Sequence, residues 1–174
     1  MRLIGLSGWS GSGKTTLLTA LIPVLVGRGN TVSTIKHAHH SFDIDKPGKD
    51  SFVHRRAGAH EVLISSNQRW ALMHELRGSP EPDLRDLLAR LGPVDLVLVE
   101  GFKRDAHPKI EIYRSVMGEP LLYPQDRRIM AIATDTPLPG PAVPQVDLND
   151  IEAVADLVER HAAELAGIDW NGPD

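Results

Sequence analysis

The sequence contains no cysteine, which excludes disulfide bonds and metal sites built from thiolates. It also lacks an excess of positive charge: the formal net charge of −4 argues against a protein that coats nucleic acid. No basic start followed by a long apolar run is found near the N-terminus, so neither a signal peptide nor a spanning helix is expected. We therefore expect a cytoplasmic protein that binds neither nucleic acid nor membrane.

What is present is the balance of an ordinary globular chain, with 174 residues of which 41% are hydrophobic and 24% charged. This length lies within the usual range for one domain. Proline and glycine are spread between apolar runs and cluster only at residues 137–144 and in the last few residues. We predict a single domain over residues 1–166 and a loose C-terminal tail over residues 167–174.

The first thirty residues carry the strongest pattern. Residues 2–7 (RLIGLS) predict a buried strand, residues 8–15 (GWSGSGKT) fit the P-loop motif GxxxxGKT, and leucines at 17, 18, 21 and 25 predict a helix over residues 16–29. An accidental glycine-rich turn is the alternative. The strand before the motif and the helix after it favour the P-loop.

The chemistry of phosphate binding explains the composition of this loop. Backbone N–H groups must converge on phosphate oxygens, which requires glycine. Lys14 would reach the terminal phosphates, Thr15 would offer a hydroxyl to Mg²⁺, and the helix dipole would favour the anion. The candidate nucleotide-binding residues here are Gly8, Ser10, Gly11, Ser12, Gly13, Lys14, Thr15 and Thr16. Lys14 is also a candidate catalytic residue.

Two further strands end in charged residues. Residues 31–36 predict a strand ending at Lys36, and residues 94–99 predict a central strand followed by Glu100. Ligands bind at the carboxyl ends of parallel strands, so Lys36 would lie beside the P-loop. Glu100 would contact Mg²⁺ or orient a water molecule, and it is a candidate catalytic and metal-binding residue. The alternatives are a solvated lysine and a strand-end glutamate without a role.

The segment of residues 37–59 is polar until Asp50 begins a short helix that ends near Gly58. We interpret it as a switch-type loop suited to holding Mg²⁺ and steering phosphates. His37, His39 and His40 lack a clear fourth ligand for zinc. Exposure to solvent or contact with a substrate is the better interpretation of these histidines.

The rest of the chain alternates strands and helices. Residues 61–65 and 69–74 predict two short strands, and residues 83–91 a helix. Residues 109–113 (KIEIY) predict a half-buried strand with Glu111 facing outward. The remaining expected elements are a strand at 128–134 and a helix from Asn149 or Asp150 to about residue 166. The predicted fold is α/β, of the P-loop NTPase class: three α/β/α layers around a mostly parallel sheet with some antiparallel strands.

The end of the strand at 128–134 is a candidate site for a nucleotide base. Thr134 and Asp135 lie there, and a carboxylate accepts two hydrogen bonds from guanine, from its ring N–H and its amino group. Adenine offers no such pair. A turn-forming aspartate is an equally good interpretation of Asp135.

These residues resemble those of a bacterial family of adaptor proteins in molybdopterin-guanine dinucleotide biosynthesis. The family is known as protein B of that pathway (MobB), and its members are P-loop GTP-binding proteins. The blocks that carry the resemblance are GWSGSGKTTLL, TIKHAHHSFDIDKPGKDSFVHRRAGA, LVEGFK followed by PKIEIYR, IATD and VDLNDIEAVAD. The resemblance implies binding of GTP and Mg²⁺, slow GTP hydrolysis at most, and a homodimer. It also implies assistance to a molybdopterin guanylyltransferase partner that attaches GMP to molybdopterin, with molybdopterin itself as a possible ligand.

On matching positions, the resemblance implies that residues 11–16 hold phosphates and that Thr15 and Glu100 contact Mg²⁺, with Asp50 as a further candidate ligand. Lys36 and Glu100 also resemble the strand-end residues of the dethiobiotin synthetase group. The chain departs from typical GTPases in lacking an Asn-Lys-x-Asp sequence, so only Thr134 and Asp135 are available to read the base.

Two other functions compete with a GTP-binding adaptor that is at most a weak GTPase. One is a small-molecule kinase or ATP-dependent ligase of the same P-loop class. The other is a pterin-carrying scaffold that uses nucleotide only for structural integrity. The adaptor is favoured because no pair of water-orienting and charge-stabilising residues is identifiable, although Arg55, Arg56 and Lys103 are candidates.

Overall fold

A computed structural model describes residues 1–38 and 42–170. The chain forms two compact units, and each is described by itself. The first unit comprises Met1–His37 together with the chain from Leu87 onward, and the second comprises Ala38–Asp86. The single domain predicted over residues 1–166 stays a prediction.

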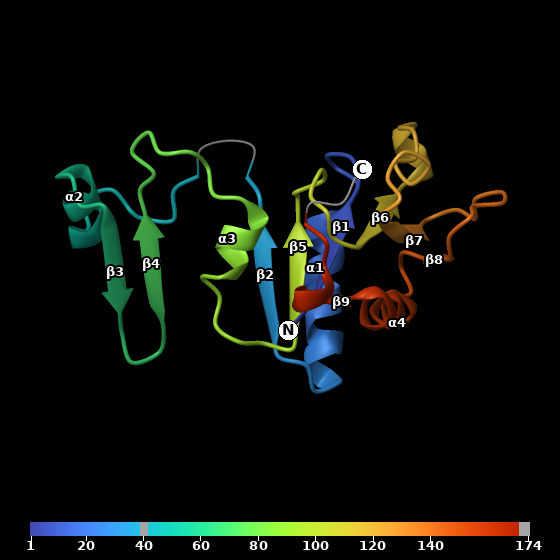
Figure 1. The fold of residues 1–174 in the computed structure, drawn as a ribbon, viewed down its shortest axis with the longest axis horizontal. Coiled ribbons are helices and arrows are strands. Elements are labelled where there is room, and N and C mark those ends of the chain that lie inside the picture. Colours follow the sequence, from blue (N-terminus) through green and yellow to red (C-terminus); the bar gives the residue numbers. More distant parts are fainter. Residues whose placement is uncertain (39–41, 171–174) are drawn as a thin grey trace. The chain divides into compact units, whose positions relative to one another are not determined.

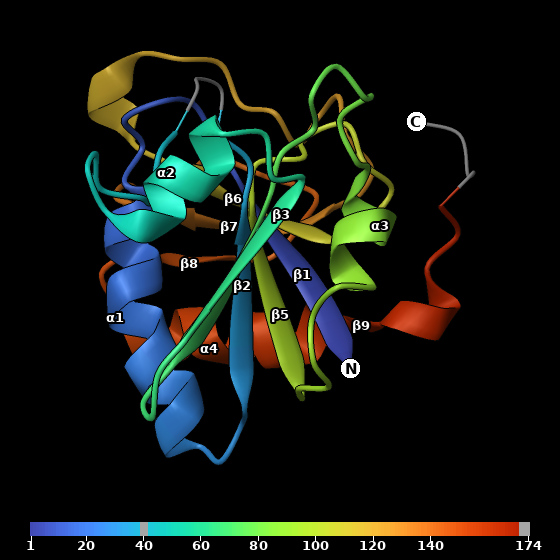
Figure 2. The same cartoon turned by 90° about the vertical axis from the view of Figure 1, so that its left-hand side faces the viewer.

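The first unit contains a seven-stranded sheet with the order β2-β5-β1-β6-β7-β8, and β9 pairs with β1 (Figure 1). Strands β1, β2, β5, β6, β7 and β8 are parallel, and β9 is antiparallel to β1. Figure 2 shows β2, β5 and β1 side by side. The predicted mostly parallel sheet is thereby confirmed. The strands are β1 (Arg2–Ser7), β2 (Val32–Lys36), β5 (Leu96–Glu100), β6 (Lys109–Tyr113), β7 (Ile129–Thr134), β8 (Gln145–Asp147) and β9 (Ala163–Glu164).

One face of this sheet, the apolar face, is covered by helices α1 (Lys14–Gly27) and α4 (Ile151–His161), which also pack against each other. Side chains alternate between the two faces of a strand, so every second residue points toward the helices. The helices contribute the leucines of α1 that the sequence pattern indicated. The sheet contributes Ile4, Leu6, Leu96, Leu98, Ile110, Ile112, Ala131 and Ala133.

The opposite face, over β1 and β6, is polar. Gly5 pairs with Lys109 and Ser7 with Glu111, so these four residues share this polar face. Lys109 is 1% exposed and Glu111 is 0% exposed. The prediction that Glu111 faces outward was wrong. Its carboxylate is buried because it accepts hydrogen bonds from the backbone N–H groups of Leu122 (2.7 Å) and Tyr123 (2.9 Å).

Helix α4 is shorter than its sequence pattern predicted. Asp150 caps it, since its Oδ1 accepts a hydrogen bond from Ala153 N at 3.0 Å. The helix ends at His161 because Ala163–Glu164 pairs with β1 and leads into a 3₁₀ turn, η2 (Leu165–Gly167). Helix α3 (Leu84–Leu88) is likewise shorter than predicted, and a second 3₁₀ turn, η1 (Ser115–Met117), follows β6. Within the described ranges, no helix is long and apolar enough to cross a membrane.

The second unit contains α2 (Asp50–Arg56) and an antiparallel hairpin of β3 (Glu61–Ser65) and β4 (Trp70–His74). Arg55 ties its segments together. The guanidinium donates to both carboxylate oxygens of Asp43, at 2.7 and 2.9 Å, and to Glu75 Oε1 at 3.0 Å. These bonds connect the segment before α2 with the end of the hairpin.

Candidate phosphate-binding site

The loop between β1 and α1 has a backbone that only glycine adopts readily. Gly8, Gly11 and Gly13 have φ values of +146°, +82° and +92°. A Cβ atom at Gly8 would lie 2.6 Å from the carbonyl oxygen of Ile112. The glycines of the motif therefore serve this loop geometry, as a loop that wraps an anion requires.

The start of α1 offers hydrogen-bond donors. Gly13 is the N-cap and has no side chain to accept a hydrogen bond, whereas Asp150 caps α4. The backbone N–H groups of Lys14 and Thr15 donate to no acceptor in the described part of the chain. Unpaired N–H groups and the helix dipole together favour an anion at this position. Ser10 and Thr16 are exposed beside them.

The Lys14 ammonium lies within the loop itself. Its Nζ donates to Gly8 O (3.0 Å), Trp9 O (2.8 Å) and Ser12 Oγ (3.4 Å). Burial, and then the nearby charge of Lys103, lower the pKa of Lys14, while Glu100 opposes the shift. The Lys14 ammonium is thus held in the loop by neutral acceptors alone, and its charge is not neutralised by a bonded carboxylate.

Three predicted site residues meet at the end of the central strands. Thr15 Oγ1 lies 3.1 and 3.3 Å from the two carboxylate oxygens of Glu100. Lys36 Nζ lies 3.4 Å from Thr15 Oγ1 and 3.4 Å from Glu100 Oε1. The parallel pairing of β2 with β5, in which Lys36 is opposite Glu100, produces this arrangement. We call these three residues the strand-end cluster.

The donor set of the strand-end cluster suits a hard cation. A hydroxyl and a carboxylate are oxygen ligands of the kind that Mg²⁺ prefers. Among residues 1–38 and 42–170, no group of three or more histidine, aspartate or glutamate residues is arranged to hold a metal. A magnesium ion at Thr15 and Glu100 would therefore take its other ligands from phosphate and water, as is usual for Mg²⁺.

Arg114 is a residue of the loop's surroundings that sequence analysis missed. It follows β6, and its Nε donates to Ser12 O at 3.1 Å. The guanidinium would lie 3.2 Å from a Cβ atom at Gly13. Arg114 directly follows the carboxyl end of β6, so its place beside the loop can be predicted only once β6 is known to pair with β1.

Trp9 also fixes the loop. Its Nε1 donates to Pro120 O at 2.8 Å, and Lys103 Nζ lies 5.4 Å from the centroid of its ring. The indole therefore connects the phosphate loop to the segment after η1 and holds a cation beside it.

Thr134 and Asp135 lie at the end of β7, as predicted for a base site. Asp135 Oδ1 accepts a hydrogen bond from Ser115 N at 2.9 Å, and this bond lowers the pKa of the carboxyl group. Thr134 Oγ1 donates to Thr136 O at 2.8 Å. Both residues line a pocket of about 290 Å³, together with Pro137, Gln145, Val146 and Asp147.

The remaining candidates are Asp50 and the histidines of residues 37–40. Asp50 begins α2 in the second unit, where its side chain is exposed, and its role as a magnesium ligand stays a prediction. His37 N donates to Glu100 O at 2.8 Å, and its ring lies 4.9 Å from that of Phe102. His39 and His40 lie outside the described residues.

Comparisons with known proteins agree with this architecture. A family model described as "Molybdopterin guanine dinucleotide synthesis protein B" (MobB) matches residues 3–135. The chain is 46% identical over 159 residues to the molybdopterin-guanine dinucleotide biosynthesis adapter protein of Escherichia coli (strain K12), covering 90% of each. It is 45% identical over 162 residues to the Haemophilus influenzae protein of the same name, covering 91% of this chain and 88% of that one.

Solved structures show the same fold. The crystal structure of a MobB protein homolog from Bacillus stearothermophilus superposes with a TM-score of 0.66 at 27% identity, covering 91% of this chain and 95% of that one. A crystal structure of molybdopterin-guanine biosynthesis protein B superposes with a TM-score of 0.71 at 25% identity, covering 91% of this chain and 98% of that one.

Proposed function

Because the chain belongs to the MobB family, we propose that it binds GTP with Mg²⁺ at the loop of residues 8–16. In this proposal it is an adaptor that assists the molybdopterin guanylyltransferase in attaching GMP to molybdopterin in the cytoplasm. Its GTP hydrolysis is slow at most, and its main output is a change in how it engages the partner enzyme. The names of the curated relatives support the pathway, and the loop geometry supports the ligand.

The contact between Thr15 and Glu100 carries this proposal. It places a hydroxyl and a carboxylate together at the carboxyl end of β5, beside unpaired N–H groups at the start of α1. Mg²⁺ held there supplies charge neutralisation for the phosphates. Lys14 and Lys36 add positive charge on the same side of the sheet, and Arg114 braces the loop backbone from β6.

Glu100→Gln tests the magnesium half of the proposal. The amide keeps the size of the side chain but removes the charge that attracts Mg²⁺. Calorimetric titrations with GTP at increasing magnesium should show that the variant loses most of the magnesium-dependent gain in affinity and retains the magnesium-independent part. Glu164→Gln is the matched control, since this glutamate is 68% exposed and lies on β9, which pairs with the start of β1. Equal magnesium dependence in both variants would remove Glu100 from the site.

Asp135 tests the base preference. The ionised carboxylate accepts from Ser115 N and retains further lone pairs, which suit the ring N–H and the amino group of guanine. Asp135→Asn should lower GTP affinity and raise affinity for xanthosine triphosphate, because the amide donates where the carboxylate accepts. Titration of both nucleotides into each protein measures the switch, and an unchanged preference contradicts this role.

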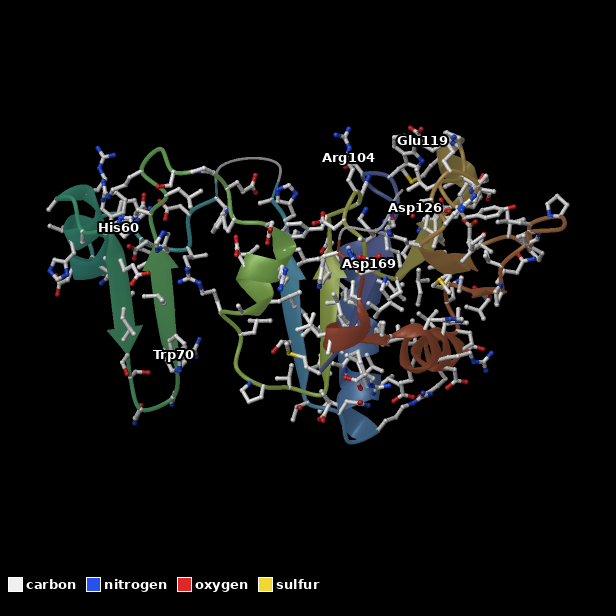
Figure 3. The ribbon with its side chains drawn as sticks, in the orientation of Figure 1. His60, Trp70, Arg104, Glu119, Asp126 and Asp169 are labelled. Carbon is white, nitrogen blue, oxygen red and sulfur yellow. The ribbon has the colours of Figure 1, made fainter. Side chains whose placement is uncertain are left out.

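A homodimer is part of the proposal, and the second unit offers apolar surface that supports it. Leu63 is 62% exposed and Trp70 is 67% exposed, and Figure 3 labels Trp70 on the hairpin. Leu72, beside them on β4, is 42% exposed. Sedimentation of Leu72→Lys should show a shift toward monomer, with Gln68→Lys in the hairpin turn as the control. Identical dimerisation of the two variants would exclude this surface.

The adaptor role predicts an effect on the partner enzyme. GMP attachment to molybdopterin by the guanylyltransferase of the same organism should proceed faster or further with the protein and GTP present. Lys14→Ala should abolish this effect, whereas Arg90→Ala should retain it, because Arg90 is exposed and lies in the segment before the amino end of β5, while the phosphate loop follows the carboxyl end of β1. Equal stimulation by both variants would separate the adaptor role from nucleotide binding.

A further inference from the structure

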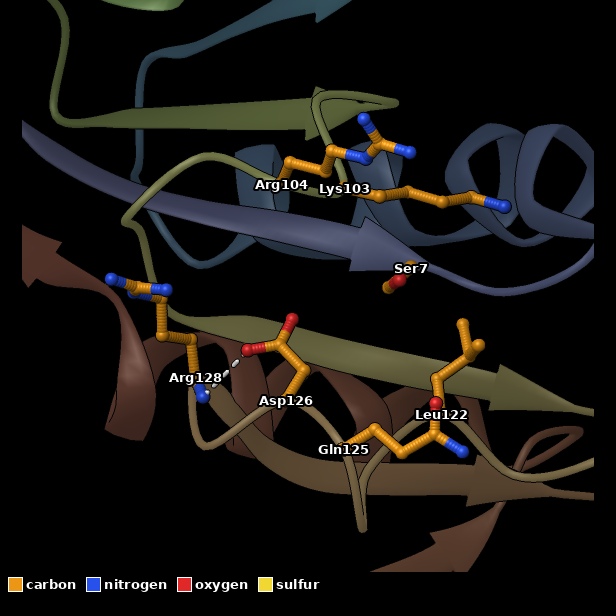
Figure 4. A pocket seen from close by; sticks show the side chains of 7 residues that line it. All are labelled: Ser7, Lys103, Arg104, Leu122, Gln125, Asp126 and Arg128. Atoms are coloured by element: carbon orange, nitrogen blue, oxygen red, sulfur yellow. Dashed lines mark hydrogen bonds between the residues drawn. The ribbon is translucent and has the colours of Figure 1, made fainter. Parts of the chain in front are cut away.

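A second cavity lies beside the end of β1, and Lys103, which lies over the Trp9 ring of the phosphate loop, is part of its lining. Its volume is about 490 Å³, within the range of small-molecule sites. Figure 4 shows Ser7 at the end of β1, with Leu122 and Asp126 across from it. The lining residues are Ser7, Lys103, Arg104, Leu122, Gln125, Asp126 and Arg128.

Ser7 contributes a hydroxyl group to the lining of this cavity. The residue is 2% exposed and shares the polar face of the sheet with Glu111, its register partner. Its hydroxyl makes no hydrogen bond to any residue that the structure describes. The hydroxyl is therefore available to a ligand in the cavity, to which it can donate one hydrogen bond.

The charge of the lining is positive. The lining contains three cationic residues, Lys103, Arg104 and Arg128, and one carboxylate, Asp126. That carboxylate is already satisfied, because Oδ2 accepts from Lys109 Nζ at 3.1 Å and Oδ1 accepts from Arg128 N at 2.9 Å. Arg104 makes no ion pair within the described ranges, so its charge is available to a ligand.

Buried charges hold the walls of this cavity in place. Glu111 binds the N–H groups of Leu122 and Tyr123, and Lys109 Nζ donates to Asp105 O at 2.8 Å as well as to Asp126. Burying such groups is costly unless they are fully bonded. The phosphate loop uses neither Glu111 nor Lys109, so these residues serve the lining of the second cavity.

We propose that this cavity is a second ligand site, which takes a small polar phosphate monoester. The phosphate contacts the Ser7 hydroxyl and the cationic side chains of Lys103 and Arg104. The amide of Gln125, which both donates and accepts hydrogen bonds, contacts the polar body of the molecule. The site adjoins the phosphate loop in sequence, since Ser7 precedes Gly8, and so it brings a second phosphorylated molecule next to the proposed nucleotide.

An NMR titration of the full chain tests the site. In a Lys14→Ala background, which silences the phosphate loop, ribose 5-phosphate and inorganic phosphate are added at constant ionic strength. Saturable shifts are expected in the backbone amides of Leu122, Gln125 and Arg128, with the monoester binding more tightly than phosphate. An absence of saturation, or shifts confined to residues 11–16, overturns the proposal.

Arg104→Glu should weaken this binding roughly tenfold, because it replaces an attractive charge with a repulsive one. Arg127→Glu is the matched control: it makes the same charge change beside the cavity on an exposed residue that does not line it. Equal weakening by both substitutions indicates a nonspecific charge effect and contradicts a built site.

GTP titration of Arg104→Glu separates this inference from the proposed function, on which it does not rest. Retained GTP affinity with lost monoester binding supports two sites. Loss of both makes the cavity a part of the nucleotide site and overturns the inference alone. Monoester binding by a protein that never binds GTP overturns the proposed function and leaves the inference standing.

Discussion

The two faces of the central sheet are both buried, but different interactions cover them. On the apolar face, leucines of α1 and aliphatic residues of α4 pack on alternate residues of four strands. On the polar face, over β1 and β6, loops cover Lys109 and Glu111 and bind them through their backbone N–H and carbonyl groups. Packing on the apolar face involves no hydrogen bonds between side chains. On the polar face, the buried charged side chains depend on their hydrogen bonds to the loops.

The two faces therefore contribute differently to the structure. Hydrophobic burial is non-directional and tolerant of small shifts, so the apolar face supplies stability to the sheet and positions α1. Hydrogen-bonded buried charges require particular partners at particular distances, so the polar face fixes the loops after β5 and β6. The strand-end cluster and the second cavity lie where these loops meet the carboxyl ends of the strands.

The largest effect is expected from the apolar face. Leu21 is 0% exposed, and Leu21→Ala should lower the free energy of unfolding by about 3–4 kcal/mol through lost burial and a residual cavity. Val26→Ala on the same helix is the control, since Val26 is 52% exposed and should cost about 0.5 kcal/mol or less. Urea unfolding measures both, and similar costs would contradict the assignment of this face.

The polar face should respond to chemistry rather than to size. Glu111→Leu fills a similar volume but leaves the N–H groups of Leu122 and Tyr123 without acceptors, so it should cost about 2–3 kcal/mol. Glu111→Gln keeps one acceptor oxygen and should cost about 1 kcal/mol. If leucine were tolerated as well as glutamine in urea unfolding, the buried carboxylate would not be holding these loops.

A smaller, pH-dependent effect is expected from His107, which packs over Gly5 on the polar face. Burial, with the charges of Lys109 and Arg128, lowers its pKa to about 3 from an ordinary value of 6.5. Between these values the unfolded chain binds a proton that the folded protein does not, so stability falls as pH decreases below about 6.5.

Between pH 6.5 and 5 this histidine should therefore account for a loss of roughly 1–2 kcal/mol. His107→Gln removes the titration and should flatten the dependence of stability on pH across that window. Thermal unfolding of both proteins at several pH values measures the difference. Parallel profiles would show that the histidine is protonated in the folded state or reached by water.

The smallest effect concerns the start of α4. Asp150→Ala removes the acceptor for Ala153 N and should cost about 1 kcal/mol, whereas Asp150→Asn should be nearly neutral. The contrast with α1 is informative, because Gly13 leaves the first N–H groups of that helix without a side-chain cap. An equal response to alanine and asparagine would show that Asp150 acts by its charge rather than as a cap.

The sequence predicted best those features that local pattern determines. The run from β1 through the loop into α1, and the strands ending at Lys36 and Glu100, follow from periodicity and from a motif of eight residues. Glu111 was misplaced because the N–H groups that permit its burial belong to Leu122 and Tyr123, which lie outside any strand or helix pattern.

Other features depend on pairing between distant segments. Helix α4 ends early because Ala163 and Glu164 pair with β1 at the other end of the chain. The contact of Arg114 with Ser12 requires that β6 lie beside β1, a sheet order that the sequence pattern does not contain. Local propensity cannot report contacts of this kind, which arise only when the sheet assembles.

Binding of GTP at the loop between β1 and α1 is the central claim, and one calorimetric comparison tests it most directly. Wild-type protein and Lys14→Ala, both shown to be folded by circular dichroism, are titrated with GTP and with ATP, with and without Mg²⁺. We predict saturable binding of GTP by the wild type, tighter with Mg²⁺ and tighter than for ATP, and no binding by Lys14→Ala. Wild-type protein that gives no heat with either nucleotide, or a variant that binds as well as the wild type, would contradict the account.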